Sequence, residues 1–463
     1  MMTRTQTKNS PTSTPGNSVW AATARAGDPP LKPLPGSTKV DVAVIGAGFT
    51  GLSAAHYLRA SGLQTAVLDA NDVGFGASGR TGGMGVPRYK TGFAALDAKY
   101  GTDTVRRLHR LILEAVDTLE ELVRDHRIEC NFQRHGHITA AHWPEALAGL
   151  RNDVDWLAKV QGDRTPSLLD ARTMQLRTGT SVYAGGYFDP RGAGIHPLEY
   201  VRGLAHSLAE RGVAIHPRTP VSRIDEAAGG GFEVLTPHGT VTARQVLIAT
   251  NAYTDAHSLN VNLGRRIVPV ASSVIATAPL VEELAATILP QGNLVTDTRK
   301  LTNYFRMLPD RRLMFGGRGD LLGRDAPGSF RGIEELLLAT YPQLEGKVEI
   351  VNRWSGKVAV TLDDFPHIGS LKPGLHFALG YGGRGVALAQ LLGKMLAKLA
   401  RGERVMAGPM SDNAFPPIPF HIFRVPAMQT MVMYYRWLDQ RAAKQPRPQG
   451  DLPDVAAANR TSK

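Results

Sequence analysis

The first residues whose spacing suggests chemistry form a glycine pattern, Gly46-Ala47-Gly48-Phe49-Thr50-Gly51. The apolar run Val40–Ile45 before it predicts a buried strand, and Leu52–Ser61 after it predicts a helix. In such a unit the glycines let the backbone approach a pyrophosphate, and the helix N-terminus attracts its charge. Asp69 follows Gly51 by 18 residues, at the end of a second predicted strand, where a carboxylate accepts ribose hydroxyls and disfavours a 2′-phosphate. The pattern favours a dinucleotide other than NADP; the alternative is a glycine turn in an unrelated α/β fold.

A second glycine pattern, Gly380–Gly385, lies between the apolar run Leu375–Leu379 and the helical run Val386–Leu399. A second nucleotide site would need another strand and an acidic residue after this helix. The polar stretch 401–409 has no such strand. The pattern therefore favours one flavin, with this helix N-terminus directed at another part of the same cofactor.

A third glycine-rich stretch is Gly74–Met84, with five glycines in eleven residues. A stretch in which nearly half of the residues lack a side chain suits a backbone that passes close to a large flat ligand. A flexible surface loop is the alternative.

The three stretches together resemble the FAD-dependent D-amino acid oxidase superfamily, and most of all its γ-glutamylputrescine oxidase-like and glycine oxidase-like members. Residues Gly76–Gly83 match the loop Gly-Ala-Ser-Gly-Arg-Asn-Gly-Gly of that group, with Thr81 in place of asparagine. Residues Gly380–Val386 match Gly-Tyr-Ser-Gly-His-Gly-Val, with Gly382 for serine and Arg384 for histidine.

The resemblance implies non-covalent FAD and a role for each matched segment. The first pattern and Asp69 would hold the ADP half, residues 78–82 would follow the pyrophosphate and the isoalloxazine, and Val221 would meet the adenine. Residues 383–386 would direct a helix dipole at the pyrimidine edge of the flavin. The residues so assigned are Gly46, Gly48, Phe49, Thr50, Gly51, Asp69, Ala70, Gly76, Ala77, Ser78, Arg80, Thr81, Gly82, Val221, Thr250, Asn251, Gly383, Arg384, Gly385 and Val386.

The substrate side is less defined in the sequence. Tyr304 and Arg306 are two apart on a strand-like run and so share one face, which predicts substrate contacts, with Arg306 binding a carboxylate. A surface arginine beside a core tyrosine is the alternative. Trp354 is predicted either to wall the pocket or to belong to the core. His135 and His137 could face the flavin or be structural.

The implied reaction is an amine or amino-acid dehydrogenation at a C–N bond, with hydride transfer to FAD and hydrolysis of the imine. Candidate substrates are γ-glutamylated polyamines, N-methyl amino acids and D-amino acids, and dioxygen or a quinone would accept the electrons. Two other functions stay open: a flavoprotein acting on a modified RNA base, and a flavin-binding redox protein of low turnover.

The elements that must position these residues predict an α/β fold with a Rossmann-like FAD-binding domain and a second, mainly antiparallel-sheet substrate domain. The predicted segments are an extended or disordered arm at 1–38; an FAD domain made of 39–90, 190–255 and 350–405; a substrate domain made of 91–189 and 256–349; and a C-terminal helix with a loose tail at 406–463. Separate strands are predicted at Val241–Ala243 and Val246–Ala249, and further strand-like runs at 267–277 and 301–315.

Composition sets outer limits on function. The formal net charge is +12, but the basic residues scatter, so nucleic-acid binding is not expected. The single cysteine, Cys130, excludes an internal disulfide and a dithiol redox site, and no metal site is expected. The chain has no apolar run long enough to span a bilayer, so a cytoplasmic location is expected. Residues 427–438 predict a packed terminal helix, with a membrane-facing or subunit-facing patch as the alternative; the oligomeric state stays open.

Overall fold

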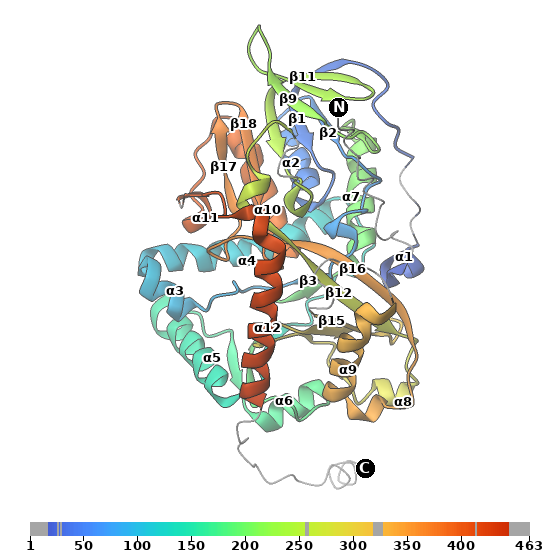
Figure 1. Cartoon of the computed structure of the whole chain (residues 1–463), viewed down its shortest axis with the longest axis vertical. Helices are drawn as coiled ribbons and strands as arrows, with labels where there is room; N and C mark the ends of the chain where they lie inside the picture. Colours follow the sequence, from blue (N-terminus) through green and yellow to red (C-terminus); the bar gives the residue numbers. More distant parts are fainter. Residues whose placement is uncertain are drawn as a thin grey trace, which may run out of the picture.

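The computed structural model describes residues 17–25, 27, 30–254, 259–317, 327–412 and 414–443. Two large sheets organise the chain, the first in the upper part of Figure 1 and the second below it. Residues 1–16 of the predicted arm and residues 444–463 of the predicted tail lie outside the described residues.

The first sheet has the strand order β17-β18-β11-β1-β2-β8, and β10 and β9 extend from β11. Strands β8, β2, β1, β11 and β18 pair in parallel. Helix α2 (Phe49–Ala60) follows β1, so the carboxyl ends of β1 and β2 place Gly46 and Asp69 at one edge. The strand bounds are β1 Thr38–Ile45, β2 Thr65–Leu68, β8 Ala214–His216, β9 Arg223–Glu226, β10 Phe232–Thr236, β11 Gly239–Ile248, β17 His367–Lys372 and β18 Leu375–Leu379.

Strand β11 corrects one prediction. Where two short strands are predicted, Gly239–Ile248 is one continuous strand of ten residues. It pairs with β10 over its first half, with β18 over its second half, and with β1 from Val241 to Ile248. These long-range partners keep the strand extended across the polar residues 244–245, which the local pattern takes for a break.

The second sheet has the order β16-β12-β15-β14-β13-β4-β6-β5 and is antiparallel except where β13 pairs with β4. It confirms the predicted fold class. The run 301–315 forms two strands, β14 and β15, that pair as a hairpin. Strand β16 also belongs to this sheet, although the predicted FAD segment begins at residue 350. The bounds are β4 His137–Ala141, β5 Ser167–Leu169, β6 Gly185–Asp189, β12 Val268–Thr277, β13 Leu294–Asp297, β14 Tyr304–Met307, β15 Leu313–Gly317 and β16 Ile350–Val360.

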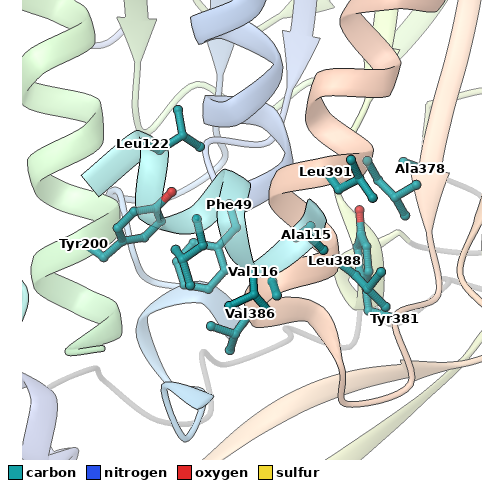
Figure 2. Packing of buried hydrophobic residues seen from close by; sticks show 14 of the residues in the cluster. Phe49, Ala115, Val116, Leu122, Tyr200, Ala378, Tyr381, Val386, Leu388 and Leu391 are labelled. Carbon is teal, nitrogen blue, oxygen red and sulfur yellow. The ribbon is translucent and has the colours of Figure 1, made fainter. Parts of the chain in front are cut away.

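Helices α2 and α10 pack against strands of the first sheet. Helix α10 (Gly385–Ala400) packs between α2 and α4 (Thr102–Asp125), and Ser53 Oγ donates to Gln390 O at 2.7 Å. Figure 2 shows the apolar side chains that meet here. The other elements are α3 Phe93–Tyr100, α5 Pro144–Trp156, α6 Ala171–Thr178, α7 Pro197–Glu210, α8 Glu282–Ala285, α9 Arg331–Thr340, α11 Pro409–Asp412 and the two-stranded pair β3 Met84–Gly85 and β7 Ala193–Gly194.

The two ends of the described chain differ from prediction. The amino-terminal arm contains a short helix, α1 (Val19–Thr23), because the Ser18 hydroxyl caps it by accepting from Ala21 N, and Trp20 is only 2% exposed. The terminal helix α12 (Arg424–Ala443) exists as predicted but is not fully packed, since Met433, Tyr434 and Trp437 are exposed. Among the described residues, no helix combines the length and apolarity needed to cross a membrane.

Candidate active site

A cavity of about 430 Å³ lies between the two sheets. The turn at 46–51, the loop at 74–84 and the turn at 380–385 all contribute to its wall, although they are far apart in the sequence. Strands β12, β13, β14 and β16 of the second sheet supply the opposite wall. The three glycine stretches therefore share one cleft.

The first glycine turn is fixed by backbone packing. Gly46 has φ +107°, a conformation that favours glycine, and its N–H donates to Leu68 O at 2.7 Å. A Cβ on Gly51 would lie 1.9 Å from Gly46 O, so only glycine lets α2 pack on the turn. At the helix N-terminus, Phe49 N donates to the Ser78 hydroxyl at 3.0 Å, which links this turn to the second loop.

Asp69 holds the same turn from the end of β2. Its Oδ2 accepts from Ala47 N at 2.7 Å and its Oδ1 accepts from Asn71 N at 2.9 Å. Burial raises the pKa of Asp69 to about 6, against the opposing effect of these main-chain donors. Asp69 lines the cavity at the carboxyl end of β2.

The second loop is held from behind by buried donors of three distant elements. Trp354 Nε1 donates to Arg80 O at 2.8 Å, and Trp20 Nε1 donates to Thr81 O at 2.8 Å. Arg306 NH1 donates to Gly83 O at 2.9 Å and to Ile195 O at 3.0 Å. Three carbonyls of the loop thus accept from two indoles and a guanidinium.

These contacts correct two predictions about substrate binding. Arg306 is 4% exposed and Trp354 is 1% exposed, and neither lines the cavity. The guanidinium that was expected to bind a carboxylate faces main-chain carbonyls, so both residues position the loop. Of the three predicted substrate contacts, only Tyr304 lines the cavity, and its hydroxyl lies 3.0 Å from Ser272 Oγ.

The third stretch ties the other two together. The Tyr381 hydroxyl lies 2.7 Å from Thr50 Oγ1, and Gly380 N donates to Asn251 Oδ1 at 3.0 Å. Helix α10 begins at Gly385 on the cavity wall. Figure 2 shows Val386 of this helix near Phe49 of α2, which packs edge-on against Tyr200 with ring centroids 5.3 Å apart.

The residues predicted to bind the cofactor gather in this cavity. Gly46, Gly48, Phe49, Thr50, Asp69, Ala70, Gly76, Ala77, Ser78, Arg80, Thr81, Gly82, Val221, Thr250, Asn251, Gly383, Arg384, Gly385 and Val386 all line it. Gly51 does not line it but shapes the turn. Lys300, Lys357, Thr296 and Ser272 also line it and were missed, because each sits in a strand or loop whose pattern shows no spacing of its own.

Cations dominate the titratable groups of the wall. Asp69 is the one acidic residue among the described lining residues, against Arg80, Lys90, Lys300, Lys357 and Arg384. Lys90 pairs with Asp364, and Lys357 lies over the Tyr253 ring. No carboxylate of the described chain forms an ion pair with Arg384. Burial, and the charge of Arg88, lower the pKa of Arg384 to about 10, so it stays a cation at neutral pH.

His135 and His137 are the two histidines predicted either to face the flavin or to be structural, and only His137 is buried. His137 lies behind the wall, where its Nε2 is 3.0 Å from the Thr296 hydroxyl. Burial, together with the charges of Arg384 and Arg88, holds the pKa of His137 well below its usual range. It is therefore neutral and orients Thr296. His135 does not line the cavity.

The groups on the cavity wall match the chemical groups of FAD. A turn rich in glycine, the helix N-termini of α2 and α10 on the cavity wall and a carboxylate at the end of β2 match the needs of a pyrophosphate and a ribose. The cationic excess matches the negative charge of the two phosphates. The donor set and the shape of the cleft therefore fit a flavin dinucleotide, and together they define a dinucleotide-binding α/β flavoprotein.

Comparisons with known proteins are consistent with this class. A model of the family described as FAD dependent oxidoreductase, DAO, matches residues 41–399. The chain is 33% identical over 426 residues to gamma-glutamylputrescine oxidoreductase of Escherichia coli, covering 92% of this chain and 98% of that protein. The chain belongs to the DAO family of FAD-dependent oxidoreductases.

Solved structures agree on the fold. Glycine oxidase of Geobacillus kaustophilus superimposes with a TM-score of 0.67 at 23% identity, covering 81% of this chain and 98% of that one. The L-amino acid deaminase of Proteus vulgaris gives a TM-score of 0.67 at 20% identity, covering 82% and 94%. At this identity the likeness concerns the fold.

Proposed function

We propose that this enzyme oxidises the C–N bond of an amine or amino acid that carries an anionic group. The likeness to gamma-glutamylputrescine oxidoreductase supports the reaction class. The observation that carries the proposal is the position of Arg384, a half-buried cation on the cavity wall without an ion-pair partner in the described chain.

FAD would lie along the three glycine stretches in this proposal. Gly46–Gly51 and Asp69 would hold its ADP half, and Val221 with Thr250 and Asn251 would close the adenine end. Residues 78–82 would follow the pyrophosphate to the flavin, and α10 would direct its N-terminal dipole at the ring. When bound, FAD supplies a hydride acceptor and an electron sink.

The substrate would then occupy the wall of the second sheet, around Tyr304, Thr296 and Arg384. Tyr304, Thr296 and Arg384 all line the cavity, and the Thr296 hydroxyl lies 3.0 Å from Nε2 of His137, whose pKa the charge of Arg384 helps to lower. A guanidinium binds a carboxylate through paired hydrogen bonds, which would orient the substrate over the flavin. Arg384 thus takes the role that the sequence assigned to Arg306.

The chain's own residues position the substrate more than they move protons. Asp69, at the end of β2, would be engaged by the ribose, and His137 is neutral and does not line the cavity. The hydroxyls of Tyr304 and Ser272 lie 3.0 Å apart and offer neutral hydrogen-bonding groups. This arrangement suits a neutral amine that gives up a hydride, with the imine hydrolysed after release. Dioxygen or a quinone would re-oxidise the flavin.

An anaerobic panel of amines and amino acids tests this function through loss of the flavin's visible absorbance. We expect bleaching by amines that carry a carboxylate, and weaker bleaching by matched amines without one. In Arg384→Met the KM for the carboxylated amine should rise, whereas flavin content should be retained. A panel that leaves the flavin oxidised throughout would contradict the proposal. Readmission of air then separates an oxidase from a dehydrogenase.

A further inference from the structure

An exposed apolar surface lies outside the cavity, on the segment that leads into α12 and on α12 itself. Phe420 is 82% exposed, Ile422 is 80% and Phe423 is 61%, and along the helix Met433, Tyr434 and Trp437 are each at least half exposed. These six residues are called the apolar ridge below. Large exposed apolar surfaces on monomers mark interaction sites.

The projecting residues belong to an anchored segment. Just before them, Phe415 stacks on His367 with ring centroids 4.2 Å apart, and Ile418 N donates to Arg265 O at 2.8 Å. His421 lies between the exposed residues, yet it is buried and its Nε2 is 3.0 Å from Ile267 O. The fold therefore holds the backbone in place and presents Phe420, Ile422 and Phe423 outward.

Helix α12 shows the same division between a docked and an outer face. Met428 and Val432 are buried, and Asp439 accepts from Lys300 N at 2.9 Å and from Leu301 N at 3.1 Å. At about 100° per residue, Tyr434 and Trp437 lie on the side opposite Val432. Because the helix is apolar on both sides, one face remains without a partner in the described chain. In Figure 1 α12 runs down the front of the molecule.

Charge indicates what covers this face. Arg424, Arg436 and Arg441 lie on α12, and its single acidic residue, Asp439, is already bound to main-chain N–H groups. Two copies packed ridge to ridge would bring arginines together without acidic partners. An anionic bilayer supplies both the negative charge and the apolar interior, and Tyr and Trp favour its interface.

The chain's own ends are poor candidates for the same face. Residues 1–16 and 444–463 contain no aromatic residue, and their large apolar residues are limited to Met1, Met2, Leu452 and Val455. A segment of this composition cannot match the area that six large apolar side chains present.

We infer that the apolar ridge binds the surface of an anionic lipid bilayer. The side chains of Phe420, Ile422 and Phe423 enter the bilayer, and Tyr434 and Trp437 lie at the headgroups. Asp439 ties α12 to the Lys300–Thr302 loop of the cavity wall. That loop then lies about 10 Å from the bilayer, one helix diameter away.

Co-sedimentation of the FAD-loaded full chain with vesicles tests this inference. The vesicles contain phosphatidylglycerol and phosphatidylcholine, or phosphatidylcholine alone. We expect pelleting with the anionic vesicles, less at high ionic strength, and little with the neutral ones. The triple variant F420S/I422S/F423S should bind at least about tenfold more weakly, which corresponds to about 1.4 kcal/mol. The matched control Leu176→Ser, at a position 64% exposed on α6, should bind like the wild type.

Tryptophan fluorescence reports which face binds. Trp437 is 51% exposed, whereas Trp20, Trp156 and Trp354 are buried and Trp143 is half-buried. Anionic vesicles should shift the emission to the blue, and Trp437→Phe should remove the shift. Absence of pelleting by folded, yellow protein at low salt would overturn the inference. So would pelleting without the shift, or a dimer that the triple variant dissociates while vesicles leave it unbound.

Discussion

The glycine turn at 46–51 and the loop at 74–84 line the same cavity, but they are held by different means. The turn is shaped by its own backbone: Gly46 adopts φ +107°, and Gly51 lies against Gly46 O. The loop depends on donors from residues 20, 306 and 354, which come from three distant elements. Local sequence therefore determines the first structure, and tertiary packing determines the second.

The largest expected effect on stability and FAD binding comes from a substitution in the turn at 46–51. Gly51→Ala places a Cβ 1.9 Å from a main-chain oxygen, a clash with backbone that costs about 3 kcal/mol or more. We expect a lower Tm and loss of FAD. Gly149→Ala is the matched control, because a Cβ there meets nothing within 4 Å. Equal Tm values for the two variants would show that the turn is not set by packing.

A smaller effect is expected where the loop loses a distant donor. Arg306→Leu leaves Gly83 O and Ile195 O without their buried partner, at a cost of about 2 kcal/mol. Flavin affinity should fall, whereas the KM for substrate, measured at saturating FAD, should stay near wild type. Arg110→Leu, at an exposed position on α4, is the control. A raised KM for substrate together with normal FAD affinity would show that Arg306 contacts the substrate, as the sequence predicts.

The turn also predicts a pH dependence. Burial raises the pKa of Asp69 to about 6, and the ribose hydroxyls of FAD would donate to the ionised form of this carboxylate. FAD affinity should therefore rise as the pH increases through about 6 and level off above it, with a loss of about tenfold one unit below the pKa. Equilibrium dialysis across this range measures the profile. Asp69→Asn should bind weakly with a flat profile, and a slope that persists in this variant would assign it to another group.

The smallest effect is expected for the indole of the amino-terminal arm. Trp20→Phe keeps an aromatic ring in the core but removes the hydrogen bond to Thr81 O. The loss of this hydrogen bond costs about 1 kcal/mol of stability. Flavin should dissociate faster, as followed by recovery of its fluorescence. Trp143→Phe, at a half-buried position away from the cavity wall, serves as the comparison. Identical release rates would mean that the arm does not hold the loop.

The same contrast explains what could be predicted from sequence. The turn, α2 and the carboxylate of Asp69 follow one another within 30 residues, so their spacing alone indicated a nucleotide site. The strand-like pattern around Tyr304 and Arg306 correctly predicts a strand, but it cannot show that Arg306 faces main-chain carbonyls. Trp20 lies in the segment predicted as an extended or disordered arm, and its hydrogen bond to Thr81 O joins residues 61 positions apart, which no local pattern indicates.

The continuous strand β11 and the terminal helix show the same limit. Pairing with three strands keeps Gly239–Ile248 extended through its polar centre. In α12 apolar residues surround the helix, and the sequence cannot tell which of two apolar faces meets the body. Asp439, which binds Lys300 N and Leu301 N, fixes that choice through a contact 138 residues or more distant.

The stoichiometry of FAD in wild type and in Gly48→Leu is the most direct test of the cavity as the flavin site. Gly48 lines the cavity, and even a Cβ there would lie 2.9 Å from Ser78 Oγ. The account predicts a yellow wild type with one FAD per chain and a folded Gly48→Leu protein without colour. A folded wild type that cannot take up FAD, or a Gly48→Leu protein that retains it in full, would contradict the account.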